Sequence, residues 1–324
     1  MIISSEHDET NIDVLRAHGR TFYWAGQLLS GAHLSKAARL YSLCRAIDDL
    51  ADEASTPHQK AAALSELSDI ESALADDCWP KTNVGAIPQQ AFSLFSNHPV
   101  ALVALRDLIK AIKRDLQPVS VDSYPELFQY AYGAAGTVGV MMACVLDAKN
   151  LQKALPHAID LGIGMQLTNI ARDVLEDAYL DRIYLPAQAA AGPLDAKRLI
   201  TGDPGTRNMA WKGIRELLLI AESYYQSGWE GLIYLPVRPR VAIAVAARLY
   251  QQIGRKILSE GQAVYWNRRT VVSWPQKIPI TLKAIVQLTG QMPSQIRSHS
   301  HRARLHEGIE TCLKDFQCAG ANHL

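Results

Sequence analysis

Apolar residues recur three and four positions apart along most of the chain, and this periodicity limits its fold more than any other feature. The spacing places apolar side chains on one face of a helix. It extends over windows 34–53, 60–74, 99–116, 125–146, 155–175, 208–232 and 240–262. Alternating, strand-like patterns are scarce, and the Pro- and Gly-rich gaps have the length of loops rather than domain linkers. We therefore expect an all-α, single-domain bundle of roughly eight or more helices.

Composition excludes several classes of protein. The chain has 324 residues, of which 48% are hydrophobic and 20% charged, as in ordinary soluble globular proteins. A formal net charge of +1 provides no field that would attract nucleic acid. The five cysteines are odd in number and form no C-x-x-C pair. This argues against a disulfide framework or a zinc site and favours a reducing cytoplasm.

One charge-free stretch, 127–146, approaches the length of a membrane span. It contains several polar side chains, among them Gln129, so we expect a buried core helix rather than a span. Within it, Gly133, Gly136 and Gly139 recur three apart. Their spacing suits either a smooth groove for a ligand chain or the close approach of a neighbouring helix, and the sequence leaves both open.

A first polar ladder lies in the window 34–53. Tyr41, Arg45, Asp48 and Asp52 are spaced four, three and four apart, so they share one helix face. Asp48 and Asp52 repel each other at this spacing unless a positive charge lies between them. The ladder therefore indicates a site that holds cations.

A second ladder lies in the window 155–175 and just beyond it. Gln166, Asn169, Asp173 and Asp177 again share a helix face. No charge occurs from 161 to 171, and apolar or small residues cover nearly every other side. A polar stripe on such a buried helix needs partners, which a wet internal cavity containing cations would supply.

Two such ladders facing each other would place several carboxylate oxygens across a gap. Mg²⁺ prefers hard oxygen ligands and is usually shared between a few carboxylates and substrate phosphates. One D-x-x-x-D pattern is common by chance, but two of them, each preceded by polar residues in register, form a specific signal. Together with the nearby arginine and tyrosine, they predict a metal–diphosphate site.

These segments resemble the squalene and phytoene synthase family over residues 15–290. Residues 48–52 stand where the family carries its first aspartate-rich motif. Residues 18–23 are similar to its flap segment, and residues 130–139 to its Y-x-Y-x-x-A-G-x-x-G segment. Residues 166–186 are similar to its second signature, and residues 239–253 to its late tyrosine-bearing helix. Asp181 and Gly19 depart from the residues usual in the family, which affects loop geometry rather than the reaction class.

The resemblance implies an isoprenoid-synthase-type helical bundle with a central cavity. We expect a flexible N-terminus (1–14), a catalytic domain (15–292) and a basic C-terminal tail (293–324). The tail is rich in arginine and histidine, and we expect a solvated end. Contact with anionic lipid headgroups, or metal binding by His299 and His301, are the alternatives.

The resemblance also implies an activity, that of a prenyltransferase. Two geranylgeranyl diphosphates would condense head to head, through a cyclopropyl diphosphate, to phytoene in the first committed step of carotenoid biosynthesis. Mg²⁺, with Mn²⁺ as a potential substitute, would be held by Asp48, Asp52, Asn169, Asp173 and Asp177. The catalytic residues would be the four aspartates of this set together with Tyr41 and Arg45.

A wider set of residues is expected to bind substrate. Arginine suits phosphate oxygens through its planar fork of donors, and the rings of Phe22 and Tyr130 suit developing positive charge. The full set is His18, Arg20, Thr21, Phe22, Tyr41, Arg45, Tyr130, Gly136, Val138, Gln166, Asn169, Arg172, Tyr250 and Arg268.

Two alternatives stay open. A relative that uses farnesyl diphosphate would form squalene, dehydrosqualene or hydroxysqualene, and an inactive homologue would only bind prenyl lipids. No G-x-G-x-x-G dinucleotide fingerprint occurs, which favours phytoene, made without NADPH. Since substrate and product are lipids, we expect a cytoplasmic protein on the inner face of the membrane, with downstream carotenoid enzymes as potential partners.

Overall fold

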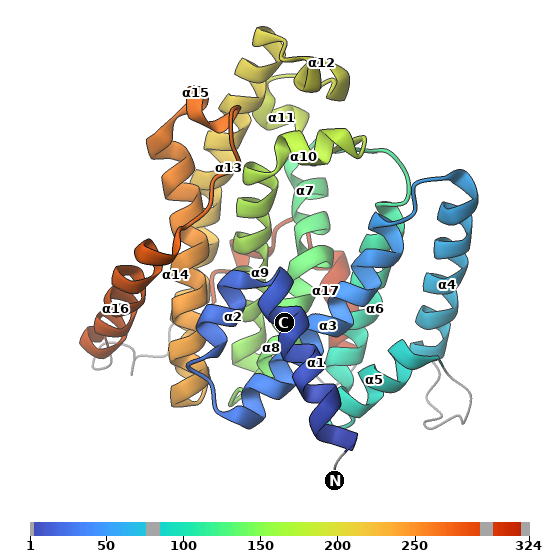
Figure 1. The fold of residues 1–324 in the computed structure, drawn as a ribbon, viewed down its shortest axis with the longest axis vertical. Helices are drawn as coiled ribbons and strands as arrows, with labels where there is room; N and C mark the ends of the chain where they lie inside the picture. The colour runs from blue at the N-terminus through green and yellow to red at the C-terminus, as the bar shows by residue number, and fades with distance from the viewer. Residues whose placement is uncertain (1–2, 76–84, 292–300, 319–324) are drawn as a thin grey trace.

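Helices make up nearly all of the computed structural model, which describes residues 3–75, 85–291 and 301–318 (Figure 1). The N-terminal half holds α1 (Ile3–His18), α2 (Arg20–Gly26), α3 (Gly31–Asp52), α4 (Pro57–Ala75), α5 (Ala86–Phe95), α6 (Pro99–Arg114), α7 (Tyr124–Ala131), the π-helical turn η1 (Tyr132–Gly136) and α8 (Thr137–Val145). The rest comprises α9 (Leu151–Arg172), α10 (Val174–Tyr179), α11 (Ala187–Ala190), α12 (Ala196–Thr201), α13 (Pro204–Gly231), η2 (Leu232–Tyr234), α14 (Val237–Glu260), α15 (Gln262–Tyr265), α16 (Trp274–Gln291), η3 (Ala303–His306) and α17 (Glu310–Cys318). Within the described residues, the strands β1 (Val119–Ser120) and β2 (Arg182–Ile183) form one short parallel pair. The prediction of an all-α fold is confirmed.

Helix α9 runs through the middle of the bundle and packs on α8, α13 and α14 (Figure 1). Leu155, Ile159, Ile163 and Leu167 recur four apart along it, and all are fully buried. Burying one such side chain stabilises the fold by about 1.5–3 kcal/mol. The apolar periodicity of the sequence is therefore the pattern of the core.

Two glycines let the backbones of neighbouring helices touch. A Cβ on Gly162 would lie 2.2 Å from the carbonyl oxygen of Ala135, and one on Gly139 would lie 2.1 Å from that of Ala158. No side chain fits at such distances. The π-helical turn η1 lies at this contact, and π turns inside helices are frequent at functional sites.

Residues 127–146 form buried helical structure, as expected. Leu127, Val140 and Met141 are fully buried in α7 and α8. Across the described residues, every helix falls short of the length and apolar character needed to cross a bilayer.

Both ends of the chain differ from expectation. Where a flexible N-terminus (1–14) was expected, residues 3–14 belong to helix α1, which packs against α3. At the other end, residues 301–318 fold back onto the bundle instead of forming a solvated tail. They bury four apolar side chains, Leu305, Ile309, Leu313 and Phe316. This spacing of four, four and three is an amphipathic pattern that the many basic residues obscured. Of the tail residues named above, His299 lies outside the described residues.

Candidate active site

A cavity of about 350 Å³ lies among helices α2, α3, α8, α9 and α14. Most of its lining is apolar, including Val138, Met142, Leu161 and Met165. Its polar lining includes residues of both ladders and of α14, together with His157 and Tyr234: Tyr41, Arg45, Asp48, His157, Gln166, Asn169, Tyr234 and Tyr250. Members of both ladders therefore lie at one cavity, whereas Asp52, Asp173 and Asp177 are not among its lining residues.

Helix α3 positions the first ladder. Ser30 caps the helix by accepting a hydrogen bond from the backbone N–H of His33 at 3.3 Å. Leu40, Leu43 and Ile47 are fully buried on one side of α3. Because these residues fix the rotation of the helix, Tyr41, Arg45 and Asp48 face the cavity.

Asp48 lies in an environment that resists its ionisation. Burial, followed by the charge of Asp52, raises the pKa of Asp48 to about 7, although Arg45 opposes the shift. Arg45 itself forms an ion pair with Asp49 at 2.7 Å. A cation placed between Asp48 and Asp52 would relieve this repulsion.

The second ladder spans the junction of two helices. Helix α9 ends at Arg172, and Asp173 leaves helical geometry before α10 begins. Arg172 Nε donates to Asp173 Oδ1 at 2.7 Å, and Arg269 donates to both oxygens of Asp173 at 2.8 Å. Burial would raise the pKa of Asp173, but these two arginines outweigh it and hold the pKa below its usual value. Asp177 has less compensation, and burial together with Asp173 raises its pKa to about 8.

Two groups outside the ladders connect them. Arg182 on β2 donates to Asp52 Oδ1 at 2.8 Å. Asp115, just beyond α6, is buried, and its charge contributes to the raised pKa values of both Asp48 and Asp177. Asp115 was missed from the sequence, where a single aspartate after an amphipathic helix gives little signal.

The donor set fits a divalent cation with oxygen ligands. Asn169 Oδ1 is buried and has no hydrogen-bond partner among the described residues, although its Nδ2 donates to Gln166 Oε1 at 3.2 Å. An unpaired buried acceptor is costly. In the same site, burial and then neighbouring carboxylates raise the pKa values of Asp48 and Asp177. A hard cation of the Mg²⁺ or Mn²⁺ type would satisfy both conditions.

Several predicted substrate contacts lie at the cavity. Phe22 stacks on Tyr250, with ring centroids 5.1 Å apart, and its centroid is 6.4 Å from that of Tyr41. All three rings, together with Val138 and Gln166, line the cavity.

Other predicted residues lie elsewhere. Tyr130 stacks on Tyr184, with centroids 4.2 Å apart, and donates to Asp115 at 3.2 Å. Gly136 packs against Ile159 of α9. Neither Tyr130 nor Gly136 is among the cavity-lining residues, so both support the site from outside it. For Gly136, close helix packing is the alternative that the structure favours.

Of two adjacent arginines, Arg269 rather than the expected Arg268 contacts the second ladder. The Arg268 side chain is 65% exposed and donates to Glu260 at 2.8 Å, whereas the next residue, Arg269, holds Asp173. Sequence spacing in a loop does not decide which of two adjacent side chains turns inward. His18, Arg20 and Thr21 are exposed or half-buried around the junction of α1 and α2, outside the cavity lining.

The fold and the site together define a class of protein: the helical isoprenoid synthases, whose apolar cavity ends at facing acidic residues. The family model described as squalene/phytoene synthase matches residues 15–276, and the chain belongs to that family. A 15-cis-phytoene synthase of Pantoea ananas is 28% identical over 296 residues, which cover 90% of this chain and 94% of that protein. A phytoene synthase of Pseudescherichia vulneris is 32% identical over 272 residues, covering 82% and 86% respectively.

Solved structures share the fold. A dehydrosqualene synthase in complex with a ligand superposes with a TM-score of 0.71 at 22% identity, covering 88% of this chain and 98% of that one. The TcSQS structure with ligand BPH1237 superposes with a TM-score of 0.68 at 18% identity, covering 98% and 100%. These likenesses confirm the isoprenoid-synthase-type bundle.

Proposed function

We propose that this chain is a phytoene synthase that condenses two geranylgeranyl diphosphates head to head. The observation that carries the proposal is one largely apolar cavity whose lining includes Asp48 of the first ladder and Asn169 of the second. Relatives named phytoene synthase that cover most of the chain support the choice of product.

Diphosphate binding falls to the polar end. Asp48, Asp52, Asn169, Asp173 and Asp177 would hold Mg²⁺, or Mn²⁺ in its place, and the bound ions supply positive charge to the departing diphosphate. The arginines beside these residues, Arg45, Arg172, Arg182 and Arg269, would donate to phosphate oxygens.

The reaction proceeds by two ionisations. In the first, the allylic C–O bond of one substrate breaks, diphosphate leaves with the electron pair, and the carbocation alkylates the double bond of the second chain. Loss of a proton closes a cyclopropyl ring that still carries its own diphosphate. That diphosphate leaves in the second ionisation, and the cation rearranges and loses a proton to give phytoene.

The apolar wall protects these cations, because water would quench them. The stacked rings of Phe22 and Tyr250, with Tyr41 nearby, offer π faces to positive charge at the polar end of the cavity. The prenyl chains would lie along Val138, Met142 and Leu161.

Product length tests this function. Purified protein is incubated with Mg²⁺ and either geranylgeranyl or farnesyl diphosphate, with and without NADPH, and the product is measured by mass spectrometry. We expect a C40 hydrocarbon from geranylgeranyl diphosphate that does not depend on NADPH. A C30 product from farnesyl diphosphate alone would assign the chain to the squalene or dehydrosqualene branch, and no release of diphosphate would indicate an inactive prenyl-lipid binder.

We also propose that α16 contacts the membrane surface. Four side chains recur four apart on one face of this helix and are 40–67% exposed: Trp274, Ile278, Leu282 and Val286. Trp24 of α2 joins this face to the cavity wall, since its Nε1 donates to Thr281 at 3.0 Å and α2 supplies Phe22 to the lining. The exposed Lys283 beside the stripe suits an anionic lipid surface.

Vesicle flotation tests the contact. We expect the chain to float with anionic phosphatidylglycerol vesicles and the combined Trp274→Ser, Leu282→Ser and Val286→Ser variant to remain at the bottom. Leu219→Ser, which removes an exposed leucine on α13, serves as the control. Equal flotation of all three proteins would contradict a role for α16.

A further inference from the structure

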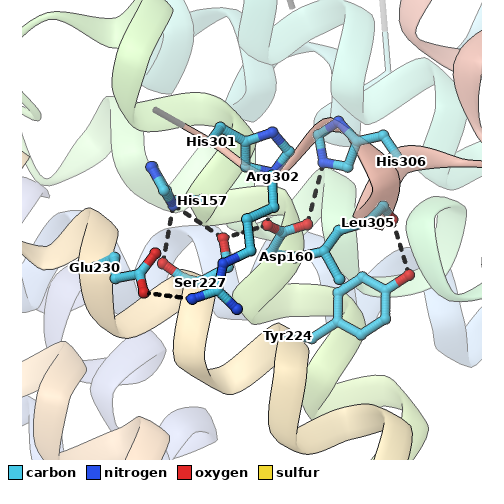
Figure 2. Close-up of polar contacts among 9 residues, drawn as sticks. All are labelled: His157, Asp160, Tyr224, Ser227, Glu230, His301, Arg302, Leu305 and His306. Atoms are coloured by element: carbon cyan, nitrogen blue, oxygen red, sulfur yellow. Dashed lines mark hydrogen bonds and ion pairs between the residues drawn. The ribbon is translucent and has the colours of Figure 1, made fainter. Parts of the chain in front are cut away.

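A second cluster of ionisable side chains lies far from the acidic ladders. Asp160 is on α9, thirteen residues before Asp173, which corresponds to about 20 Å along a helix. It is fully buried. His301 and His306 approach it from the C-terminal segment, as Figure 2 shows. The proposed condensation uses none of these three residues.

The contacts within this cluster are close. His301 Nε2 lies 2.8 Å from Asp160 Oδ2, and His306 Nε2 lies 3.1 Å from Asp160 Oδ1. Ser227 Oγ donates to Oδ2 of the same carboxylate. One ligand atom from each of Asp160, His301 and His306 can be chosen so that all three lie within 4.8 Å of one another. The cluster joins α9, α13 and the C-terminal segment.

The buried carboxylate needs positive charge. Burial would raise the pKa of Asp160, but hydrogen bonds from His301 and His306 outweigh it and lower the pKa. The nearby guanidinium of Arg302 pairs with Glu230 at 2.9 Å instead (Figure 2). A full carboxylate charge in a buried position is costly unless a cation or strong donors compensate it.

The ligand types favour a borderline transition-metal ion. Two imidazole nitrogens and one carboxylate oxygen suit Zn²⁺, whereas Mg²⁺ prefers oxygen ligands alone. His301 and His306 are separated by four residues, a spacing common in zinc sites. Ser227, bonded to the carboxylate, occupies the place of the outer partner that typically orients a ligating group.

We propose that Asp160, His301 and His306 bind a Zn²⁺-type ion that ties the C-terminal segment to α9. The two imidazoles coordinate through Nε2, and water completes the coordination. Without the ion, the Nε2–H group of each histidine donates a hydrogen bond to Asp160. The alternative to a metal site is therefore a hydrogen-bonded clasp, in which these bonds alone hold the C-terminal segment to α9.

The ion would also support the far end of the prenyl cavity. His157 lines that cavity, and its ring meets the His301 ring edge to face at 5.3 Å. Tyr224 donates to the carbonyl oxygen of Leu305 at 2.9 Å, next to His306. An ion that holds residues 301–306 in place would therefore also hold the side chains that pack behind His157.

Metal titration of the full-length chain tests the proposal. The protein is treated with chelator, dialysed, and titrated with Co²⁺ while visible absorption is recorded, and with Zn²⁺ in a calorimeter. We expect one tight equivalent, a visible cobalt band, and a rise in Tm of about 5 °C at a Zn²⁺ concentration near a hundred times Kd. His301→Gln and His306→Gln should each remove the band and the rise in Tm.

Two controls separate this site from others. His33→Gln alters a histidine outside this cluster, which pairs with Asp147 at 3.0 Å, and should bind metal like the unaltered chain. Asp48→Asn, which affects the active site, should also keep the cobalt band. The proposal is overturned if no tight equivalent binds, which leaves the hydrogen-bonded clasp. It is also overturned if binding survives in His301→Gln, a change that still offers Asp160 an N–H donor.

Discussion

Arg182 donates to Asp52 at 2.8 Å, a contact between two residues 130 positions apart that ties the end of the first ladder to the strand following the second. Arg182 stands on β2, directly after the second ladder, and Asp52 ends the first. The Arg182 guanidinium therefore offsets part of the repulsion among the carboxylates of the two ladders. Substitutions in this region are expected to separate effects on folding from effects on turnover.

Asp48→Asn is expected to abolish turnover without lowering stability. The amide removes a metal ligand, and it also removes a carboxyl whose ionisation is disfavoured by burial and Asp52. The metal-free variant should melt at the same temperature as the unaltered chain or above it. Thermal unfolding and diphosphate release measure the two effects, and retained turnover would count against the site.

Asp173→Asn should behave differently. Asp173 pairs with Arg172 and Arg269, so its removal leaves two guanidinium groups without their partner. We expect a loss of about 1–3 kcal/mol in the free energy of unfolding, in addition to the loss of turnover. Denaturant titration of both aspartate variants side by side makes the comparison, and equal stability would contradict the pairing.

Metal affinity should increase with pH up to about pH 8. Asp48 and Asp177 have folded-state pKa values of about 7 and about 8, above the usual value of 3.8. Between the unfolded and folded pKa values, the folded state holds the extra protons, so metal-free stability declines as pH rises through this window. Mg²⁺ must displace those protons. We expect Mg²⁺ to raise Tm more at pH 8.5 than at pH 6, and the difference to shrink in Asp48→Asn.

The adjacent arginines offer a matched pair of variants. Arg269→Ala removes two donors from the active site and should lower kcat/KM about 100-fold, as loss of a transition-state donor does. Arg268→Ala removes an exposed side chain paired with Glu260 and should change kcat/KM less than about threefold. Steady-state kinetics decide, and equal losses would place both side chains at the site.

Gly162→Ala should destabilise the bundle by about 3 kcal/mol. The new methyl group would lie 2.2 Å from the carbonyl oxygen of Ala135, where backbone rather than a movable side chain stands in the way. Gly31→Ala is the control, because nothing lies within 4 Å of its Cβ position at the start of α3. Its stability should be unchanged or slightly higher, since alanine favours the helix.

The sequence determined the helices and the two ladders. Both follow from local geometry: the 3.6-residue period fixes which side chains share a face, so Asp48 with Asp52, and Gln166 with Asn169, are predictable without any tertiary contact. The break between α9 and α10 at Asp173 was not predicted. A buried polar stripe also demands partners, which is why a shared cavity could be predicted.

Only the tertiary structure decided which residues meet across the bundle. Asp115 joins the acidic site, Arg269 rather than Arg268 reaches Asp173, and His301 and His306 close on Asp160. Each of these contacts depends on how elements distant in the sequence pack together. The helical period shows which side chains share a face of a helix, but not which other helix packs against that face. The sequence therefore specified the faces, and packing specified their pairing.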